Sequence, residues 1–348
     1  MIRRIALSVL LCAANLSHAQ EATSTYAAPD AVLATQLLVR STTDTEIFAP
    51  LLNAFVAAYP SIALTYEQWG SNALYAATRR DCDRDGGNGA PDAVISSGVH
   101  QIVDLVNRAC ARPYSSGRTL ALPETRRWRD EVWGITAEAA VTIYNKDLVP
   151  AAEVPRTRFD LLDLLRRKPE PYRGKIATYD IEASGLGYLF AFMDSQQATT
   201  FGGLLEGFAR VDAVATCCSA EIISAVEDGR FLIAYNVLGS YLDVMANGRV
   251  GVIYPQDYTL VLSRAYMIPK SAPHPENAAL LLDFILSPTG QAILRSNRLV
   301  QSVGPDQTTL QDSIRRTIPI APTLLVAMDQ ARRRIFVGNW RTIFGDAH

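Results

Sequence analysis

The feature that most constrains the fold is a regular alternation of short apolar runs with segments of helical periodicity. Residues 37–40 are typical of a buried strand, with three apolar residues before Arg40, and residues 46–59 repeat apolar side chains at helical spacing. Thr43 and Glu46 have the spacing of a capping box at the start of that helix. Further strands are expected at 62–67, 93–96, 175–180, 213–217, 231–235 and 250–254, and helices at 72–80, 99–109, 159–167, 187–193, 199–209, 220–228, 238–246, 275–286, 288–296 and 324–336. Strands that alternate with helices in this way predict a mostly parallel α/β sheet with helices on both faces.

The length of the chain indicates two lobes, because 348 residues exceed what one hydrophobic core usually serves. Extended segments near 136–140 and 258–264 are the expected crossings between them. On this interpretation residues 20–136 form the first part of lobe 1, residues 137–262 form lobe 2, and residues 263–348 return to lobe 1. The expected fold class is therefore α/β, with a cleft and a hinge between two lobes.

The first 19 residues have the pattern of a secretory signal peptide. Arg3 and Arg4 precede an apolar stretch at 5–16 that is too short to span a bilayer, and Ser17-His18-Ala19 supplies small residues at the cleavage positions. We expect cleavage after Ala19 and a mature protein in a bacterial periplasm. A formal net charge of −2, with no basic stripe interleaved with aromatic residues, argues against a nucleic-acid partner.

The strongest candidate for a binding element is the stretch 179–188. Here an expected strand ends in a small-residue turn at Ser184 and Gly185, and a helix follows whose first N–H groups are free to bind an oxyanion. Polar turns of the same kind follow other expected strands, so we expect several of them to converge on one cleft. These turns contain Ser41, Thr42, Ser97, Tyr235 and Asn236.

The cysteine residues indicate an oxidising compartment, and neither they nor the histidine residues indicate a metal site or a catalytic group. The four His residues do not cluster, and the adjacent Cys217 and Cys218 fit no zinc pattern. Cys82 and Cys110 are expected to form a disulfide that an oxidising periplasm would keep, whereas the pairing of Cys217 and Cys218 stays open. Since no nucleophile, base and acid assemble, we expect neither an enzyme nor a cofactor.

The acidic loop 81–92 resembles part of a calcium-binding loop, with carboxylates at its first, third, fifth and twelfth positions and Gly86 at its sixth. Asn88 stands where an apolar residue is usual, and the twelfth position holds Asp rather than Glu. A solvated acidic turn is therefore the favoured interpretation, and calcium binding is the alternative. The four carboxylates belong to Asp81, Asp83, Asp85 and Asp92.

Several motifs stand in the same order along the chain as in one protein family. They lie at 38–43, 90–94, 143–146, 234–241 and 281–291, besides the Ser184 turn. With these motifs the chain resembles the bacterial periplasmic solute-binding proteins of ABC importers, in the iron(III)-type or phosphosugar-type group, over nearly its whole length. The resemblance implies the type II periplasmic-binding-protein fold, a monomer whose lobes close on a small solute, and a permease in the inner membrane as partner. A ligand sensor that serves a histidine kinase is the alternative to an importer component.

Ferric-binding members of the wider family carry adjacent tyrosines after the strand that re-enters the cleft, because phenolate oxygens suit a hard trivalent cation. Here that place holds Tyr235 and Asn236, and Tyr241 lies further along. We therefore expect a small organic solute with a phosphate, phosphonate or carboxylate group, with ferric iron as the alternative.

The remaining candidate residues would contact the organic part of the solute. Tyr179 would stack on it or hydrogen-bond to it, and Glu138 and Asp180 would accept hydrogen bonds from its hydroxyl or ammonium groups. A hinge salt bridge for Glu138 and a turn cap for Asp180 are the alternatives.

Overall fold

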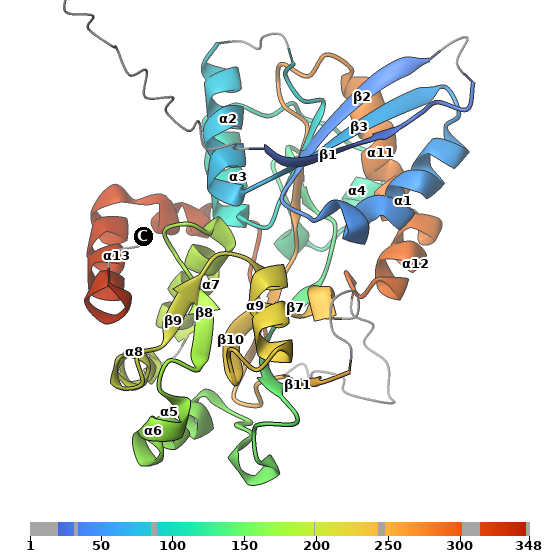
Figure 1. Ribbon diagram of the computed structural model, residues 1–348. Coiled ribbons are helices and arrows are strands. Elements are labelled where there is room, and N and C mark those ends of the chain that lie inside the picture. The colour runs from blue at the N-terminus through green and yellow to red at the C-terminus, as the bar shows by residue number, and fades with distance from the viewer. Residues whose placement is uncertain are drawn as a thin grey trace, which may run out of the picture.

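The computed structural model describes residues 20–30, 34–84, 89–197, 199–242, 248–300 and 314–345. The expected signal peptide and Asp85 of the acidic loop lie outside these residues. Two sheets, each covered by helices, form an upper and a lower lobe in Figure 1. The expected fold class, α/β with two lobes, is confirmed.

The first sheet has the order β1-β3-β2-β4-β13-β6-β5. Its centre is parallel because β2 pairs with β3 and with β4 in the same direction, while β1 and β13 join antiparallel. The strands are β1 (Gln20–Tyr26), β2 (Thr35–Ser41), β3 (Ile62–Trp69), β4 (Ala93–Ser96), β5 (Arg127–Trp128), β6 (Val132–Gly134) and β13 (Ala265–Met267). The helices of this lobe are α1 (Thr45–Ala58), α2 (Ser71–Asp83), α3 (Val99–Asn107), α4 (Gly117–Leu120), α11 (Pro275–Leu286) and α12 (Pro288–Ser296).

The second sheet has the order β14-β12-β7-β10-β8-β9, and β11 also pairs with β7. β8 runs parallel to β9 and β10, whereas β7 is antiparallel to β10, β11 and β12. The strands are β7 (Glu138–Asn145), β8 (Ile176–Tyr179), β9 (Val214–Thr216), β10 (Ile233–Leu238), β11 (Val250–Ile253), β12 (Thr259–Leu262) and β14 (Arg315–Thr317). The helices around it are α5 (Arg158–Arg167), α6 (Pro169–Tyr172), α7 (Gly185–Gln197), α8 (Phe201–Arg210), α9 (Ser219–Glu227) and the 3₁₀ turn η4 (Gly239–Tyr241).

Both sheets are therefore mixed rather than mostly parallel as expected. The reason is topological: β7 and β13 each enter directly from a segment that crosses between lobes, without the helical crossover that a parallel pairing needs. The two crossings lie side by side. The Ile135 N–H donates to the Arg264 carbonyl at 2.9 Å, and the Arg264 N–H donates to Thr136 Oγ1 at 2.9 Å.

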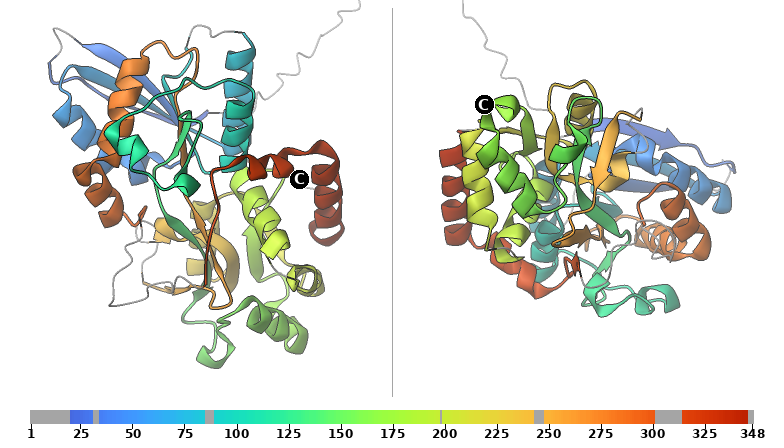
Figure 2. Two further views of the ribbon diagram at one scale, coloured as in Figure 1. Left: turned by 180° about the vertical axis from the view of Figure 1, so that it is seen from behind. Right: turned by 90° about the horizontal axis from the view of Figure 1, so that it is seen from below.

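The end of the chain differs from the expectation that residues 263–348 belong to lobe 1. β14 pairs with β12 of the second sheet, and α13 (Gln330–Phe344) packs against α8 after the 3₁₀ segment η5 (Pro322–Met328). Figure 2 shows the red α13 beside the helices of the lower lobe. The aromatic side chains of α13 explain this placement, because Phe336 packs on Tyr188 and Phe201, and Phe344 packs on Phe208.

In the part of the chain that the structure describes, no single helix is long and apolar enough to cross a bilayer, and α11 and α12 reach that length only as a pair bent by 65°.

Candidate functional site

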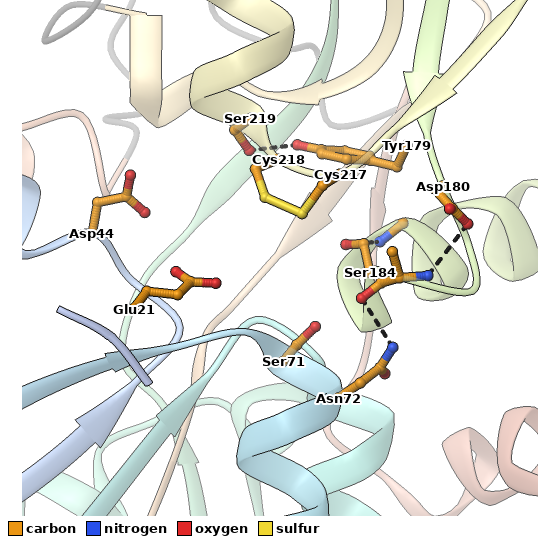
Figure 3. Close-up of a disulfide and its surroundings, with 12 residues drawn as sticks. Glu21, Asp44, Ser71, Asn72, Tyr179, Asp180, Ser184, Cys217, Cys218 and Ser219 are labelled. Atoms are coloured by element: carbon orange, nitrogen blue, oxygen red, sulfur yellow. Dashed lines mark hydrogen bonds between the residues drawn. A yellow bond between two sulfur atoms is a disulfide. The ribbon is translucent and has the colours of Figure 1, made fainter. Parts of the chain in front are cut away.

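A cavity of about 110 Å³ lies between the two lobes. Its wall takes residues from the ends of β2, β3 and β4 in lobe 1 and from the turns after β8, β9 and β10 in lobe 2, together with Arg264 at the crossing. Of the expected binding residues, the cavity brings together Thr42, Ser97, Tyr179 and Ser184. Figure 3 shows the space from close by, with Glu21 and Asp44 on one side and Ser184 on the other.

The Ser184 turn lies on the lobe 2 wall of the cavity and caps α7, which begins at Gly185. Ser184 Oγ accepts the Gly187 N–H at 3.0 Å. Glycine is needed at 187 because a Cβ there would collide with the Tyr179 side chain on β8. The helix N-terminus therefore comes close to the end of β8, with Ser184 facing the cavity.

The first turn of α7 is also held by the opposite lobe. The Gly185 N–H donates to Ser71 Oγ at 2.8 Å, and the side-chain amide of Asn72 donates to the carbonyls of Glu182 and Ala183 at 2.7 and 3.0 Å. Ser71 and Asn72 open α2 of lobe 1. The lobes are thus in contact across the cleft, and Gly185 binds lobe 1 rather than lining the cavity.

Two of the three expected lobe 1 hydroxyl residues, Thr42 and Ser97, line the cavity and hydrogen-bond to each other. Thr42 Oγ1 and Ser97 Oγ lie 3.1 Å apart, and Thr42 Oγ1 accepts the Ser97 N–H at 2.9 Å. Across the cavity, the Tyr179 hydroxyl pairs with Ser219 Oγ at 2.6 Å and accepts the Leu238 N–H at 3.2 Å. Burial raises the pKa of Tyr179 to about 12, so this phenol stays protonated.

Three other expected binding residues have structural partners instead. Asp180 caps its own turn, because Oδ1 accepts the Glu182 N–H at 2.7 Å, and Ser41 Oγ accepts the Thr43 N–H at 3.0 Å. Glu138 forms the hinge salt bridge, with Oε1 2.9 Å from Nε of Arg264. None of these three lines the cavity.

Tyr235 and Asn236 were expected in the cleft but lie inside lobe 2. The Tyr235 hydroxyl donates to Asp194 Oδ2 at 2.6 Å, and the Asn236 amide donates to the same oxygen. Nη2 of Arg158 lies 3.0 Å from Oδ1 of Asp194 and forms an ion pair with it, and both charged side chains are almost fully buried. A buried ion pair needs such extra hydrogen bonds, which explains why these polar side chains lie within the buried strand β10.

Arg264 is a cavity residue that sequence reasoning missed. Its side chain is fully buried, forks onto both oxygens of Glu138 at 2.9 and 3.1 Å, and donates to Thr43 Oγ1 at 2.9 Å. Burial alone would lower the pKa of Arg264, but Glu138 and Tyr241 outweigh it and raise the pKa, so the guanidinium stays charged.

Asp44 is a second missed residue, and it corrects the expected capping box. Asp44, not Thr43, is the N-cap residue of α1, and its side chain makes no capping hydrogen bond. The carboxylate lines the cavity, where Oδ1 accepts the Tyr241 hydroxyl at 3.0 Å. Burial raises the pKa of Asp44, although Tyr241 and Arg264 lower it in part. Glu21, at the start of β1, is a further carboxylate on the wall, and no pattern near it indicated a site.

Two disulfides are formed within the described ranges. Cys82 near the end of α2 joins Cys110 beyond α3, and both residues are buried. Cys217 joins its neighbour Cys218 in the turn between β9 and α9. This second disulfide lines the cavity, as Figure 3 shows.

The acidic loop does not have the geometry of a calcium-binding loop at the positions that the structure describes. Asp81 and Asp83 belong to α2, and Asp81 pairs with Arg40 at 3.1 Å. Asp92 is buried and accepts the Leu38 N–H at 2.7 Å. Within the described ranges no group of three or more His, Cys, Asp or Glu side chains is placed to hold a metal ion.

Comparison with known proteins now identifies the family. The model for bacterial extracellular solute-binding proteins matches residues 89–319. The chain belongs to this family. The family resemblance that the motifs indicated is confirmed. No match was found among the curated proteins.

Solved structures agree with this assignment. The substrate binding protein of the ABC transporter from Agrobacterium tumefaciens is 29% identical, with a TM-score of 0.86 over 93% of this chain and 98% of that chain. Iron-bound HitA from Pseudomonas aeruginosa is 16% identical, with a TM-score of 0.68 over 89% of this chain and 99% of that one. AfuA from Actinobacillus pleuropneumoniae, with fructose-6-phosphate bound, is 14% identical, with a TM-score of 0.67 over 90% and 99%. The last two show the fold alone.

Proposed function

We propose that this solute-binding protein serves an ABC importer and captures a small solute through an anionic group. The observation that carries the proposal is the cavity between the lobes, with the N-terminus of α7 at Ser184 on one wall and the hydroxyls of Thr42 and Ser97 on the other. At this turn the N–H groups of Gly185 and Gly187 already donate to Ser71 and Ser184. The Ser184 hydroxyl and the Leu186 N–H, from two residues on the cavity wall, would therefore hold the phosphate, phosphonate or carboxylate oxygens, together with the hydroxyls of lobe 1. The structural neighbour from an ABC transporter, and the neighbour with a bound phosphosugar, agree with both parts of the proposal.

The solute would act by favouring the closed arrangement of the lobes. The crossings at 135–137 and 263–264 belong to the hinge, and the chain passes between the lobes a third time from α12 to β14. Ser71, Asn72 and Gly185 already join the lobes across the cleft. A solute that touches both walls binds the closed state more tightly than the open one, and only this difference in affinity drives closure.

Ferric iron is the second candidate, because Tyr179 and Tyr241 line the cavity together with Glu21 and Asp44. Against it, burial raises the pKa of both phenols, and each hydroxyl has a hydrogen-bond partner. Ferric citrate added to the protein distinguishes the two candidates. A visible absorption band from iron-bound phenolate would support iron, and no new band is expected.

The anion at the Ser184 turn is tested with two variants that differ only in charge. Ser184→Asp and Ser184→Asn both keep a competent helix cap, but the first places a fixed negative charge where the anion of the solute would sit. Affinity is measured by calorimetry with a panel of fructose-6-phosphate, ethylphosphonate, 2-aminoethylphosphonate, propionate and β-alanine. For whichever compound binds, Ser184→Asn should stay within a few fold of the parent protein, while Ser184→Asp should lose at least about tenfold, or about 1.4 kcal/mol.

Thermal unfolding is the control for folding. Without solute both Ser184 variants should unfold near the temperature of the parent protein. A solute at 100 times its dissociation constant adds about 2.7 kcal/mol to the stability of the parent, which is a shift of a few degrees. If Ser184→Asp binds as tightly as Ser184→Asn, the turn is only a helix cap and the anion lies elsewhere.

A further inference from the structure

The charged side chains on the cavity wall are Glu21, Asp44 and Arg264. The positive charge of Arg264 is already balanced, because its guanidinium forks onto Glu138. The two carboxylates have neutral partners only: the side-chain amide of Gln68 donates to Glu21, and the hydroxyl of Tyr241 donates to Asp44. Among the residues that the structure describes, neither carboxylate forms an ion pair. The cavity therefore carries an excess of negative charge at one end.

The unbalanced carboxylates and the proposed anion subsite lie on different lobes. Glu21 and Asp44 come from β1 and from the start of α1 in lobe 1, whereas Ser184 opens α7 in lobe 2. Figure 3 shows them on opposite sides of the space between the lobes. A purely anionic solute would bring like charge toward Glu21 and Asp44. The positive charge of Arg264 reaches Asp44 but is already balanced by Glu138, so the approach is unfavourable in a partly desolvated site.

Part of the cavity wall is less polar. The Cys217–Cys218 disulfide, Trp69 and Leu186 contribute apolar and polarisable surface to the wall. The volume of about 110 Å³ is somewhat smaller than the roughly 150 Å³ that accommodates benzene in a protein core. β-Alanine has as many non-hydrogen atoms as benzene and 2-aminoethylphosphonate has one more, so molecules of this size match the cavity, whereas a hexose phosphate is much larger than the cavity in this arrangement of the lobes.

We infer that the solute is a small zwitterion: an ammonium group lies between Glu21 and Asp44, an anionic group lies at the Ser184 turn, and a short spacer packs on the Cys217–Cys218 disulfide. Short ω-amino acids and aminoalkylphosphonates have this chemistry. The inference rests on the proposed function, because it assumes that the cavity holds the solute and that the anion binds at Ser184. It adds the second charge and the size limit.

Matched compounds test the ammonium group. Calorimetry compares 2-aminoethylphosphonate with ethylphosphonate and β-alanine with propionate, since each pair differs by one amino group. The amino compound of at least one pair should bind at least tenfold more tightly than its partner. Equal or tighter binding of ethylphosphonate or propionate would overturn the zwitterion and leave the anionic solute standing. Failure of every phosphonate, phosphate and carboxylate in the panel would instead overturn the proposed function itself.

Two variants locate the ammonium group. Asp44→Asn keeps an acceptor for the Tyr241 hydroxyl and remains a competent N-cap residue, and Glu21→Gln keeps an acceptor for Gln68. Each should weaken the amino compound by about tenfold or more while leaving its partner compound unchanged or tighter. A merely structural role would weaken both members of a pair equally, and that result would overturn the assignment. Because burial raises the pKa of Asp44, Asp44→Asn should not lower the stability of the protein without solute.

Discussion

The two disulfides of this protein are alike in chemistry and opposite in placement. Cys82 and Cys110 are 28 positions apart in sequence and join the ends of α2 and α3 inside lobe 1. Cys217 and Cys218 are adjacent and lie in a loop on the cavity wall of lobe 2. The first pair is buried, whereas Cys217 is half-buried and Cys218 is exposed.

The two disulfides differ in the length of the chain loop that each one closes. A disulfide stabilises mainly by restricting the unfolded chain, and the effect grows with the length of the loop that it closes. A loop of the size closed by Cys82 and Cys110 corresponds to about 3 to 4 kcal/mol in that model. A bond between neighbours closes almost no loop, so Cys217–Cys218 contributes little of this kind. Its position on the cavity wall therefore points to ligand contact rather than to stability.

Removal of the buried disulfide should have the largest effect. The double variant Cys82→Ala, Cys110→Ala should lose about 2 to 4 kcal/mol of unfolding free energy in denaturant titrations. Affinity for the solute, measured on the folded fraction, should stay within about twofold, because neither residue lines the cavity. A clear loss of affinity at unchanged stability would reverse the roles assigned to the two bonds.

The fold could be predicted because its signals are local. The strand at 37–40 and the helix at 46–59 were found from periodicity alone, and the structure has β2 and α1 there. The end of the chain could not be placed in this way. The position of α13 depends on contacts of Phe336 and Phe344 with lobe 2, and the periodicity of a helix does not say which surface it packs on.

The candidate site was harder to predict, because polar partners are set by tertiary contacts. Arg264 meets Glu138 across 126 positions of sequence, and Tyr235 meets Asp194 across 41, so neither pairing was visible in a local motif. Asp44 was not recognised as a site residue, because a capping box beginning at Thr43 already explained the start of α1. The adjacency of the two cysteines in lobe 2 was visible in the sequence, but their place on the cavity wall was not.

Variants of the cavity disulfide should show the converse pattern. Cys217→Ala, Cys218→Ala and Cys217→Ser, Cys218→Ser should each change the unfolding free energy by less than about 1 kcal/mol, because almost no loop is opened. Both should weaken binding of the solute, and the serine pair should weaken it more, by several fold, since it replaces apolar surface with hydroxyl groups. Calorimetry measures the affinities, and denaturant titration measures the stabilities. Equal affinity in the parent protein and both double variants would show that the disulfide does not touch the solute.

The smallest expected effect concerns the order in which the two disulfides are reduced. A thiolate must reach a disulfide sulfur to break the bond, so the accessible Cys217–Cys218 bond should open before the buried Cys82–Cys110 bond under a low concentration of dithiothreitol. Alkylation at intervals, followed by peptide mapping, should label Cys217 and Cys218 first. A saturating concentration of the panel compound that binds most tightly should slow this labelling, because the compound covers the disulfide from the cavity side. Labelling of Cys82 and Cys110 should still occur only when the whole protein unfolds. If Cys82 and Cys110 are labelled first, the result contradicts the difference in burial between the two bonds. If the bound compound does not slow the labelling of Cys217 and Cys218, the solute lies away from this wall.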